Sequence, residues 1–481
     1  MSRRGFIARA ATAASAVVGV TGITLPGSTG TTRAAGTRMP IPDMLVPTLR
    51  DGVWVFKLRA GFGEHEVLPG VRSRTAGFNG PFLGPTIRVR NGQRVRFEVT
   101  NRLDEDLAVH WHGAHVPAKD DGGVHSAFPP GRVWKPEFTV KQEAASLWYH
   151  PHTMDRTARQ ISWGLAGMLI VDDESDASAS LPGDYGTDDI PVILQSTAVG
   201  PDGDIKYDIP GVFKRDVSFP LLVNGAGVEE VPVTLTATTG RVRLRLLNAS
   251  LADVLTIFRS DGSPLVQVAT ESAFLDRPTE VDEVRLVAGC RAEIVVDVNE
   301  VVTLRALVRS GVGRSGVGRY SFLKLLPGPG RGRLASLPSR LNHIRRYDVS
   351  GLRPRTVALT AGPGGLGING VAGTTMEAMD NNVIEVREGD LEFWEVVNRT
   401  GRTHSFHVHD VPFQLISING KQPRGVDLGW RDTVEVPRGE KLQVAMRFTD
   451  YASEKYLYML HCHIAEHEDL GMMTSLMVRP R

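Results

Sequence analysis

Ten of the fourteen histidines in this 481-residue chain fall in four short clusters, and these clusters are where the sequence could do chemistry. On a β-strand, residues two apart point to the same face, so each His-x-His pair presents two imidazoles side by side. Two neighbouring imidazoles are suited to binding a metal ion. The four clusters are His110-Trp111-His112, His150-Pro151-His152, His404-Ser405-Phe406-His407-Val408-His409 and His461-Cys462-His463-Ile464-Ala465-Glu466-His467.

The fourth cluster also holds Cys462, one of only two cysteines in the chain. The same alternation sends its thiolate to the face opposite His461 and His463, so this tripeptide could contribute ligands to two neighbouring metal sites. The ligand set of a blue-copper electron-transfer centre would be complete with His404, Cys462, His467 and a weak axial Met472. Zinc rarely takes a thioether such as that of methionine as a ligand. Neither zinc nor non-haem iron accounts for this set together with eight further histidines.

Outside these clusters the residue types favour structural roles. A single His-x-His pair is more often a coincidence than a metal site, so the prediction depends on all four clusters occurring together. Cys290 has no activating neighbour in the sequence and is expected to be a buried, inert thiol rather than half of a disulfide. Surface or hydrogen-bonded positions are expected for the remaining histidines, with a substrate-side or proton-transfer role as the alternative for the middle two: His65, His115, His125 and His343.

β-Strands must position these residues, because apolar side chains recur with a period of two along much of the chain. Residues 86–101 alternate apolar and polar side chains on both sides of a turn at Gly92. Related patterns recur over residues 240–248 and 389–398, which indicates three related domains. Few stretches keep a helical period, so we predict an all-β fold of three Greek-key sandwich or barrel domains.

Composition places the domain boundaries and excludes some partners. The chain is longer than one typical domain, and its clearest shifts in composition are the polar run 172–184 and the Pro/Gly/Arg-rich run 327–340. We therefore predict domains at residues 36–175, 176–340 and 341–481. The 55 basic and 54 acidic side chains leave a net charge of +1, which gives no bulk attraction to nucleic acid or to an anionic membrane.

Residues 1–35 have the features of an export signal. Arg3 and Arg4 precede a mildly apolar stretch rich in Ala, Val and Gly, which is the pattern of a twin-arginine signal peptide. The apolar stretch is too short to span a bilayer comfortably, so stable membrane insertion is not expected. We predict cleavage near Ala34 or Ala35 and a periplasmic or extracellular protein that folds, and could be loaded with metal, before export.

With these motifs complete and in order, the chain resembles the three-domain multicopper oxidases, which include bacterial laccases, bilirubin oxidases and copper-efflux oxidases. The similarity covers nearly the whole mature chain, and residues 84–171 closely resemble the first domain of the copper-efflux type. It implies cupredoxin-like domains that hold about four copper ions. It assigns the type 1 copper to His404, Cys462 and His467 with axial Met472, the type 2 copper to His110 and His407, and the type 3 pair to His112, His150 and His463 on one copper and His152, His409 and His461 on the other.

The resemblance also implies a reaction. Reductants would give up electrons one at a time near an exposed edge of a type 1 histidine, and the electrons would pass through Cys462 to its neighbours and reduce dioxygen to water. The first and third domains supply the ligands, which leaves the second domain as a spacer. Asp121 and Glu468 match acidic positions that relay protons in the copper-efflux type, with a turn aspartate and a solvated glutamate as the structural alternatives.

A laccase-like oxidase acting on phenols or similar reductants is the function we expect. Copper-efflux oxidases carry a long methionine-rich insertion and acidic and methionine ligands before the first type 1 histidine, whereas residues 400–403 here are Thr-Gly-Arg-Thr. Without that cover, the edge of His404 or His467 should be open to a bulky aromatic donor. The alternatives are a cuprous oxidase acting in copper tolerance and a copper-free scaffold, since one relative of this fold serves cell division after losing its ligands.

Overall fold

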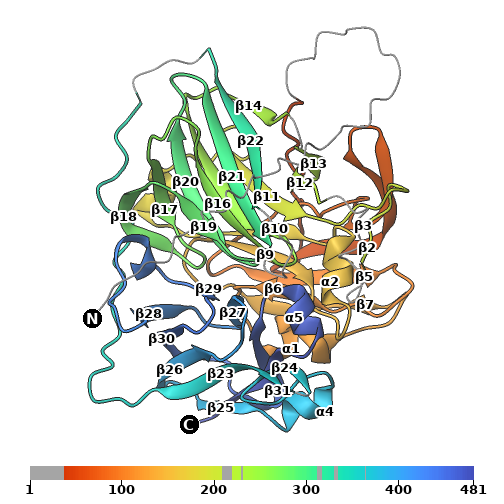
Figure 1. Cartoon of the computed structure of the whole chain (residues 1–481), viewed down its shortest axis with the longest axis vertical. Coiled ribbons are helices and arrows are strands. Elements are labelled where there is room, and N and C mark those ends of the chain that lie inside the picture. Colours follow the sequence, from red (N-terminus) through yellow and green to blue (C-terminus); the bar gives the residue numbers. More distant parts are fainter. Residues whose placement is uncertain (1–36, 208–218, 229–230, 311–316, 330–333, 363) are drawn as a thin grey trace, which may run out of the picture. The chain divides into compact units, whose positions relative to one another are not determined.

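The computed structural model describes residues 37–207, 219–228, 231–310, 317–329, 334–362 and 364–481 (Figure 1). The predicted signal segment lies outside these residues. Among the helices that are described, none is long and apolar enough to cross a membrane.

Residues 48–180 contain two sheets that share one apolar core. The elements are β1 (Thr48–Arg50), β2 (Val53–Leu68), β3 (Val71–Phe78), β4 (Ile87–Arg90), β5 (Arg94–Asn101), β6 (Val109–His112), α1 (Ala118–Asp121), η1 (Val124–Ser126), β7 (Val133–Trp134), β8 (Glu137–Thr139), β9 (Ala145–Pro151), α2 (Thr157–Ser162), β10 (Gly167–Asp172) and α3 (Asp176–Ser180). One sheet has the order β1-β2-β5-β7, with β3 on β2 and β8 on β5, and the other has the order β4-β10-β9-β6. Phe56 and Phe97 of the first sheet belong to the same buried core as Leu147 and Leu169 of the second.

Residues 189–327 also form two sheets around a shared core, and each sheet has one strand more than its counterpart in the first pair. The elements are β11 (Asp189–Ser196), β12 (Leu221–Val223), β13 (Ala226–Gly227), β14 (Val233–Ala237), β15 (Arg241–Asn248), β16 (Asp253–Arg259), β17 (Leu265–Ala269), β18 (Phe274–Val281), β19 (Val284–Leu286), β20 (Arg291–Asp297), β21 (Val302–Ser310) and β22 (Val317–Pro327). The strand orders are β13-β12-β11-β15-β20-β17-β18 and β14-β22-β21-β16-β19. Their shared core includes Leu244 and Ile294 from one sheet and Ile257 and Leu304 from the other.

Residues 355–479 form the third pair of sheets. The elements are β23 (Arg355–Gly362), β24 (Gly365–Ile368), α4 (Met376–Asp380), β25 (Ile384–Arg387), β26 (Leu391–Asn398), β27 (His404–Val408), β28 (Phe413–Ile418), η2 (Gly425–Leu428), β29 (Thr433–Val436), β30 (Lys441–Arg447), β31 (Ser453–Cys462), α5 (Ala465–Asp469) and β32 (Met473–Arg479). The strand orders are β24-β23-β26-β30-β28 and β25-β32-β31-β27-β29. Trp394 and Val444 share a core with Phe406 and Leu460. The all-β prediction is confirmed.

The three strands with the predicted alternating pattern, β5, β15 and β26, occupy equivalent places. Each pairs in parallel with an earlier strand, β2, β11 or β23, and antiparallel with a later one. Each also ends on an asparagine, Asn101, Asn248 or Asn398, whose side-chain oxygen accepts a hydrogen bond from the N–H two residues on. The three segments therefore share the same strand pairing and the same asparagine hydrogen bond. The domain boundaries near residues 175 and 340 stay predictions.

Candidate metal centre

Two antiparallel strand pairs carry most of the clustered histidines. Strands β6 and β9 pair with His110 opposite His150, and strands β27 and β31 pair with His407 opposite His461. All ten clustered histidine side chains are buried, none with more than 2% of its surface exposed. The alternation that the sequence predicted therefore places the imidazoles inside the protein, where they meet one another.

Three of these histidines converge through their ring nitrogens. His461 Nε2 lies 3.2 Å from His152 Nε2 and 3.2 Å from His409 Nε2. A metal ion bound at about 2 Å from each of three nitrogens would hold those nitrogens roughly 3 Å apart. His152, His409 and His461 therefore have the spacing of a metal site, as predicted for one type 3 copper.

The remaining five histidines of this cluster lie against that group. His112 Nδ1 and His463 Nε2 are 3.1 Å apart, and the His150 ring lies 5.1 Å from the His463 ring. The Nε2 atoms of His110, His150 and His407 are buried and have no hydrogen-bond partner among the described residues. Buried polar atoms are rarely left unpaired, so these orphaned nitrogens fit residues that bind metal.

A second group forms around the cysteine. Cys462 Sγ lies 3.4 Å from His404 Nδ1 and 3.7 Å from His467 Nδ1, and the two nitrogens are 3.2 Å apart. The Met472 backbone lies beside them, since its N–H donates to His467 O and its carbonyl accepts from Cys462 N, both at 2.9 Å, and its side chain is fully buried. The two nitrogens and the sulfur expected of a blue-copper centre are thus assembled in one place.

Burial controls the protonation of these ligands. It lowers the pKa of His152, His463 and His467 to about 3 and that of His404 to about 4, so the rings are neutral at pH 7 and their lone pairs are available to a metal. Burial also raises the pKa of the Cys462 thiol to about 12. A metal ion must therefore displace a proton from this sulfur when it binds.

Both predicted acids, Asp121 and Glu468, are buried and contact outer nitrogens of the eight-histidine cluster. His409 Nδ1 is hydrogen-bonded to Asp121 Oδ2 at 2.7 Å, and His110 Nδ1 donates to the Asp121 carbonyl at 3.0 Å. The Glu468 oxygens lie 3.1 Å from His461 Nδ1 and 3.3 Å from His152 Nδ1. Both acids are 1% exposed, so the alternative of a solvated Glu468 is wrong.

The electrostatics of Glu468 differ from what its place in the sequence suggests. Burial alone would raise the pKa of its carboxyl, but the neighbouring His152 and His461 lower that pKa well below its usual value. Although Glu468 follows His467 directly, its carboxylate contacts the histidine cluster rather than the cysteine group.

The exposed histidine edge expected at the cysteine group is absent from the structure. His404 is 0% and His467 1% exposed, and Thr400 Oγ1 lies 2.6 Å from His404 Nε2. The expectation is wrong because the loop between β26 and β27 folds over the ring. A reductant would have to approach across this loop, which presents Arg402 at the surface.

Sequence reasoning missed Asp432 and Arg291. Asp432 Oδ1 lies 3.1 Å from His112 Nε2, and both carboxylate oxygens accept hydrogen bonds of 2.6 Å from Arg291. Neither residue belongs to a histidine motif, and 141 positions separate them in the chain. No local signal in the sequence could have paired them.

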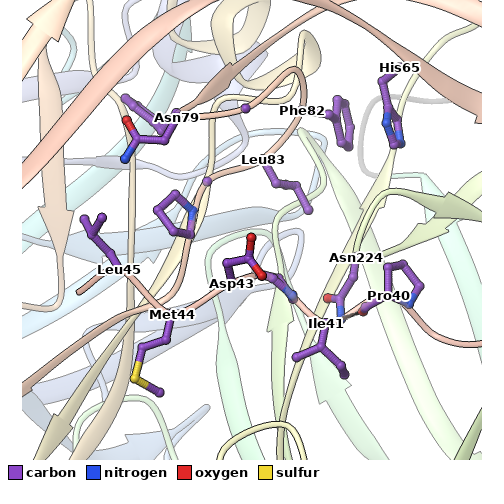
Figure 2. A pocket seen from close by; sticks show the side chains of 15 residues that line it. Pro40, Ile41, Asp43, Met44, Leu45, His65, Asn79, Phe82, Leu83 and Asn224 are labelled. Carbon is purple, nitrogen blue, oxygen red and sulfur yellow. Dashed lines mark hydrogen bonds between the residues drawn. The ribbon is translucent and has the colours of Figure 1, made fainter.

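The four isolated histidines lie outside both groups, and three of them have partners of their own. A cavity of about 330 Å³, lined in part by residues 40–45, contains His65 stacked on Phe82 at 4.7 Å (Figure 2). His65 Nε2 is hydrogen-bonded to Gly225 O, which agrees with the structural role expected for this histidine. His115 pairs with Asp410, His125 pairs with Asp380, and His343 is exposed.

Cys290 is buried and forms no disulfide, and burial raises the pKa of its thiol well above the usual value.

Comparisons with known proteins agree with this geometry. Two family models, both described as multicopper oxidase, match residues 61–176 and 353–481. The chain is 31% identical over 445 residues to multicopper oxidase mco of Staphylococcus aureus, covering 91% of each protein. It is 34% identical over 463 residues to cell division protein FtsP of Escherichia coli (strain K12), covering 93% of this chain and 94% of FtsP.

Solved structures give the same result. A multi-copper oxidase from Pediococcus acidilactici matches with a TM-score of 0.81 and 29% identity, over 94% of this chain and 93% of that one. A laccase-like multi-copper oxidase from Ochrobactrum sp., described as having oxidase activity towards lignin model compounds and lignosulfonate, matches with a TM-score of 0.81 and 32% identity, over 92% of this chain and 100% of that one. The chain belongs to the multicopper oxidase family.

Proposed function

We propose that this protein is an exported, copper-dependent oxidase that takes electrons from phenolic or similar small reductants and reduces dioxygen to water, as laccases do. The observation that carries the proposal is the presence of two complete ligand groups, one built on Cys462 and one on eight histidines. Copper bound in these groups would supply electron storage and oxygen reduction.

The residues fit the copper assignment implied by the sequence. The neutral, buried rings and the thiol at Cys462 match the donor types of a blue-copper centre, and the orphaned nitrogens of the larger cluster match a multinuclear one. Following the family resemblance, we assign type 1 copper to His404, Cys462, His467 and Met472, type 2 copper to His110 and His407, and type 3 copper to His112, His150 and His463 and to His152, His409 and His461. Of these sets, His404, Cys462 and His467, and likewise His152, His409 and His461, have ligand atoms within 4.8 Å of one another.

The chain itself links the two groups. Cys462 is joined by peptide bonds to His461 and His463, so an electron received at the cysteine group has a short covalent path to the larger cluster. Burial of every ligand excludes bulk water from both groups. The carboxylates of Asp121 and Glu468 lie beside the cluster and would hold or pass protons at the outer nitrogens.

The surface over the cysteine group favours an electron-rich organic donor over a metal cation. Burial is the main cause of the lowered pKa of His404 and His467, and the positive charge of Arg402 lowers both further. The same charge would repel a cation near these rings. Similarity to the Ochrobactrum enzyme, with its activity towards lignin model compounds, supports the same substrate class.

Two other functions have some support. Met376 is 47% exposed on α4, which would suit a cuprous oxidase acting in copper tolerance. The 34% identity to FtsP favours a scaffold in cell division, but a scaffold would not need all twelve proposed copper ligands. We therefore consider both functions less well supported than a laccase-like oxidase.

Oxygen uptake with competing reductants separates these functions. The copper-loaded protein should consume dioxygen with 2,6-dimethoxyphenol without added Cu(II), and Arg402→Glu should raise the rate with Cu(I) relative to the phenol. Phenol activity that appears only with excess Cu(II), alongside rapid Cu(I) oxidation, would indicate a cuprous oxidase. Failure to bind copper would instead favour the scaffold.

A further inference from the structure

Asp432 contacts two ligands of the histidine cluster at once. Its Oδ1 accepts a hydrogen bond from His112 Nε2 at 3.1 Å, and its backbone carbonyl accepts one from His407 Nδ1 at 2.8 Å. Asp432 is 2% exposed, and it is the residue immediately before β29. One residue therefore touches the outer nitrogen of a proposed type 3 ligand and of a proposed type 2 ligand.

These contacts fix which nitrogen of each ring faces the cluster. His112 Nδ1 lies 3.1 Å from His463 Nε2, so the His112 proton must sit on Nε2, where the Asp432 carboxylate accepts it. The His407 proton must likewise sit on Nδ1, which leaves its orphaned Nε2 free. A carboxylate bonded to the outer nitrogen of a metal-binding histidine sets the tautomer and the ring orientation.

Arg291, the first residue of β20, uses all five N–H groups to hold Asp432 against the rest of the protein. Two go to the Asp432 oxygens at 2.6 Å. The other three go to backbone carbonyls, of Ser146 at 2.8 Å, Gly289 at 3.2 Å and Glu271 at 3.1 Å. The planar fork of an arginine suits this bidentate arrangement, whereas a lysine offers a single point charge.

The ion pair joins all three parts of the chain. Ser146 lies on β9, the strand that leads to His150, whereas Arg291 comes from the middle sheets and Asp432 from the third segment. The backbone around the ligands leaves room for it, because a Cβ at Gly113, the residue after His112, would lie 2.6 Å from both Arg291 Nη2 and Asp432 Oδ2.

We propose that Arg291 is a positioning residue for the copper cluster, acting through Asp432 on His112 and His407. The middle segment would then be more than a spacer, although it holds none of the clustered histidines. This inference rests on the proposed copper function, because it concerns how the cluster is shaped and not whether copper binds.

Arg291 has a second effect on Asp432. Ligand atoms of His112, His407 and Asp432 lie within 4.8 Å of one another, so an unrestrained carboxylate could itself coordinate a metal ion. The bidentate ion pair, together with Ser272 Oγ at 3.1 Å and Thr433 Oγ1 at 2.8 Å, occupies both Asp432 oxygens. Arg291 thus helps to hold this carboxylate as the hydrogen-bond acceptor of His112 Nε2.

The test compares Arg291→Lys with Arg245→Lys in the copper-loaded protein. Arg245 is equally buried and holds Asp189 at 2.6 and 3.0 Å. Its other hydrogen bonds go to Ser146 and Glu293 and not to a clustered histidine, so it controls for loss of a buried ion pair. The readouts are copper content, the type 2 electron paramagnetic resonance signal, the near-ultraviolet band of the type 3 pair and the blue absorption of the cysteine group.

Arg291→Lys should keep the blue absorption, change the type 2 signal, weaken the type 3 band and lower cluster copper affinity or oxygen uptake by roughly 10–100-fold. Asp432→Asn should give the same changes, and the double variant should be no worse than Asp432→Asn alone. If Arg291→Lys does not fold, Asp432→Asn against Arg245→Lys decides the question.

Cluster signals that stay like those of the unaltered protein in the Arg291 and Asp432 variants, or that change equally in Arg245→Lys, would overturn the proposal. An unaltered protein that binds no copper would contradict the copper function instead, so the two failures are distinguishable.

Discussion

The histidines of the large cluster are held through the ring nitrogen that faces away from their neighbours. His150 Nδ1 donates to Pro151 O at 2.8 Å, His407 Nδ1 donates to Asp432 O at 2.8 Å, and His409 Nδ1 contacts Asp121. These partners fix the tautomer, so each ring presents a lone pair where a metal could bind. Several partners are backbone carbonyls, which belong to any residue type.

Replacing Cys462 with Ser should separate the two copper groups. We expect loss of the blue absorption with most of the cluster copper retained, because Cys462 is the one thiolate of its group and contributes nothing to the eight-histidine cluster. Absorption spectroscopy and copper analysis check this result. A variant that stays blue would show that the type 1 assignment is wrong.

The buried acids should matter for oxygen reduction and not for the colour. Asp121→Asn is expected to slow oxygen uptake by roughly 10²–10⁴-fold, as for loss of a positioned proton donor. Glu468→Gln should cause a comparable loss, because its carboxylate contacts two histidines of the cluster. Asp120→Asn is the control, since Asp120 pairs with Lys119. Uptake that is unchanged across pH in both variants would mean that protons reach the cluster by another route.

The sequence could predict which histidines come together, but not which residues hold their rings in place. Spacing of two along a strand is visible in the histidine clusters, and the structure brings all ten rings into two groups. Glu468 shows the limit, because α5 turns about 100° per residue and sends adjacent His467 and Glu468 to different groups. Adjacency in the sequence gives no sign of this separation, and Glu468 was predicted as a proton relay only from the family resemblance.

At the scale of elements, strand patterns were easier to predict than strand partners. The alternating residues 86–101 do form β4 and β5, but the turn at Gly92 carries the chain from one sheet into the other. β4 pairs with β10 and β5 with β2, so neither partner is adjacent in the sequence. Period-two alternation identifies a strand with one buried face and contains no information on which distant strand will pair with it.

The short element α1 positions Asp121, and the glycine after it should be essential. Gly122 has a φ of +84°, and a Cβ there would lie 1.8 Å from Val109 O, beside His110. Gly122→Ala should therefore cost several kcal/mol of stability, roughly 3 or more, and weaken copper binding by the cluster. Thermal unfolding and copper analysis measure both effects.

Gly92→Ala is the matched control for this change. Gly92 has a similar φ of +81°, but a Cβ there meets nothing within 4 Å. Its cost should be limited to the roughly 1–2 kcal/mol of an unfavourable backbone conformation. Equal losses in the two variants would mean that the close approach of α1 to β6 does not matter.

At the scale of the whole molecule, the proposed copper ligands come from the two ends of the chain, and Arg291 of the middle segment is bonded to Asp432 beside them. The first half of this arrangement was predictable, because the clusters lie before residue 153 and after residue 403. The second half was not predictable, since Arg291 and Asp432 are joined by a buried ion pair that has no sequence spacing to mark it.

The copper-free protein should be sensitive to acid. Burial lowers the pKa of eight clustered histidines below the ordinary 6.5, so below that pH the unfolded chain binds more protons than the folded one: His112, His150, His152, His404, His407, His409, His463 and His467. Stability should be full above pH 6.5 and fall towards pH 4, by on the order of 1 kcal/mol per histidine and pH unit.

Bound copper should protect against this loss, because protons and metal compete for the same nitrogens. Urea unfolding at a series of pH values, with and without copper, checks this expectation. Parallel pH profiles for the two forms would contradict it.

One measurement tests the central claim most directly: the blue absorption of the copper-loaded protein, followed while a phenol is added without oxygen and dioxygen is then admitted. The account predicts that the phenol bleaches the band and that dioxygen restores it, because Cys462 connects the reductant side to the cluster. His110→Ala should bleach and not recover. A protein without a blue band, or with a bleached band that dioxygen does not restore, would contradict the account.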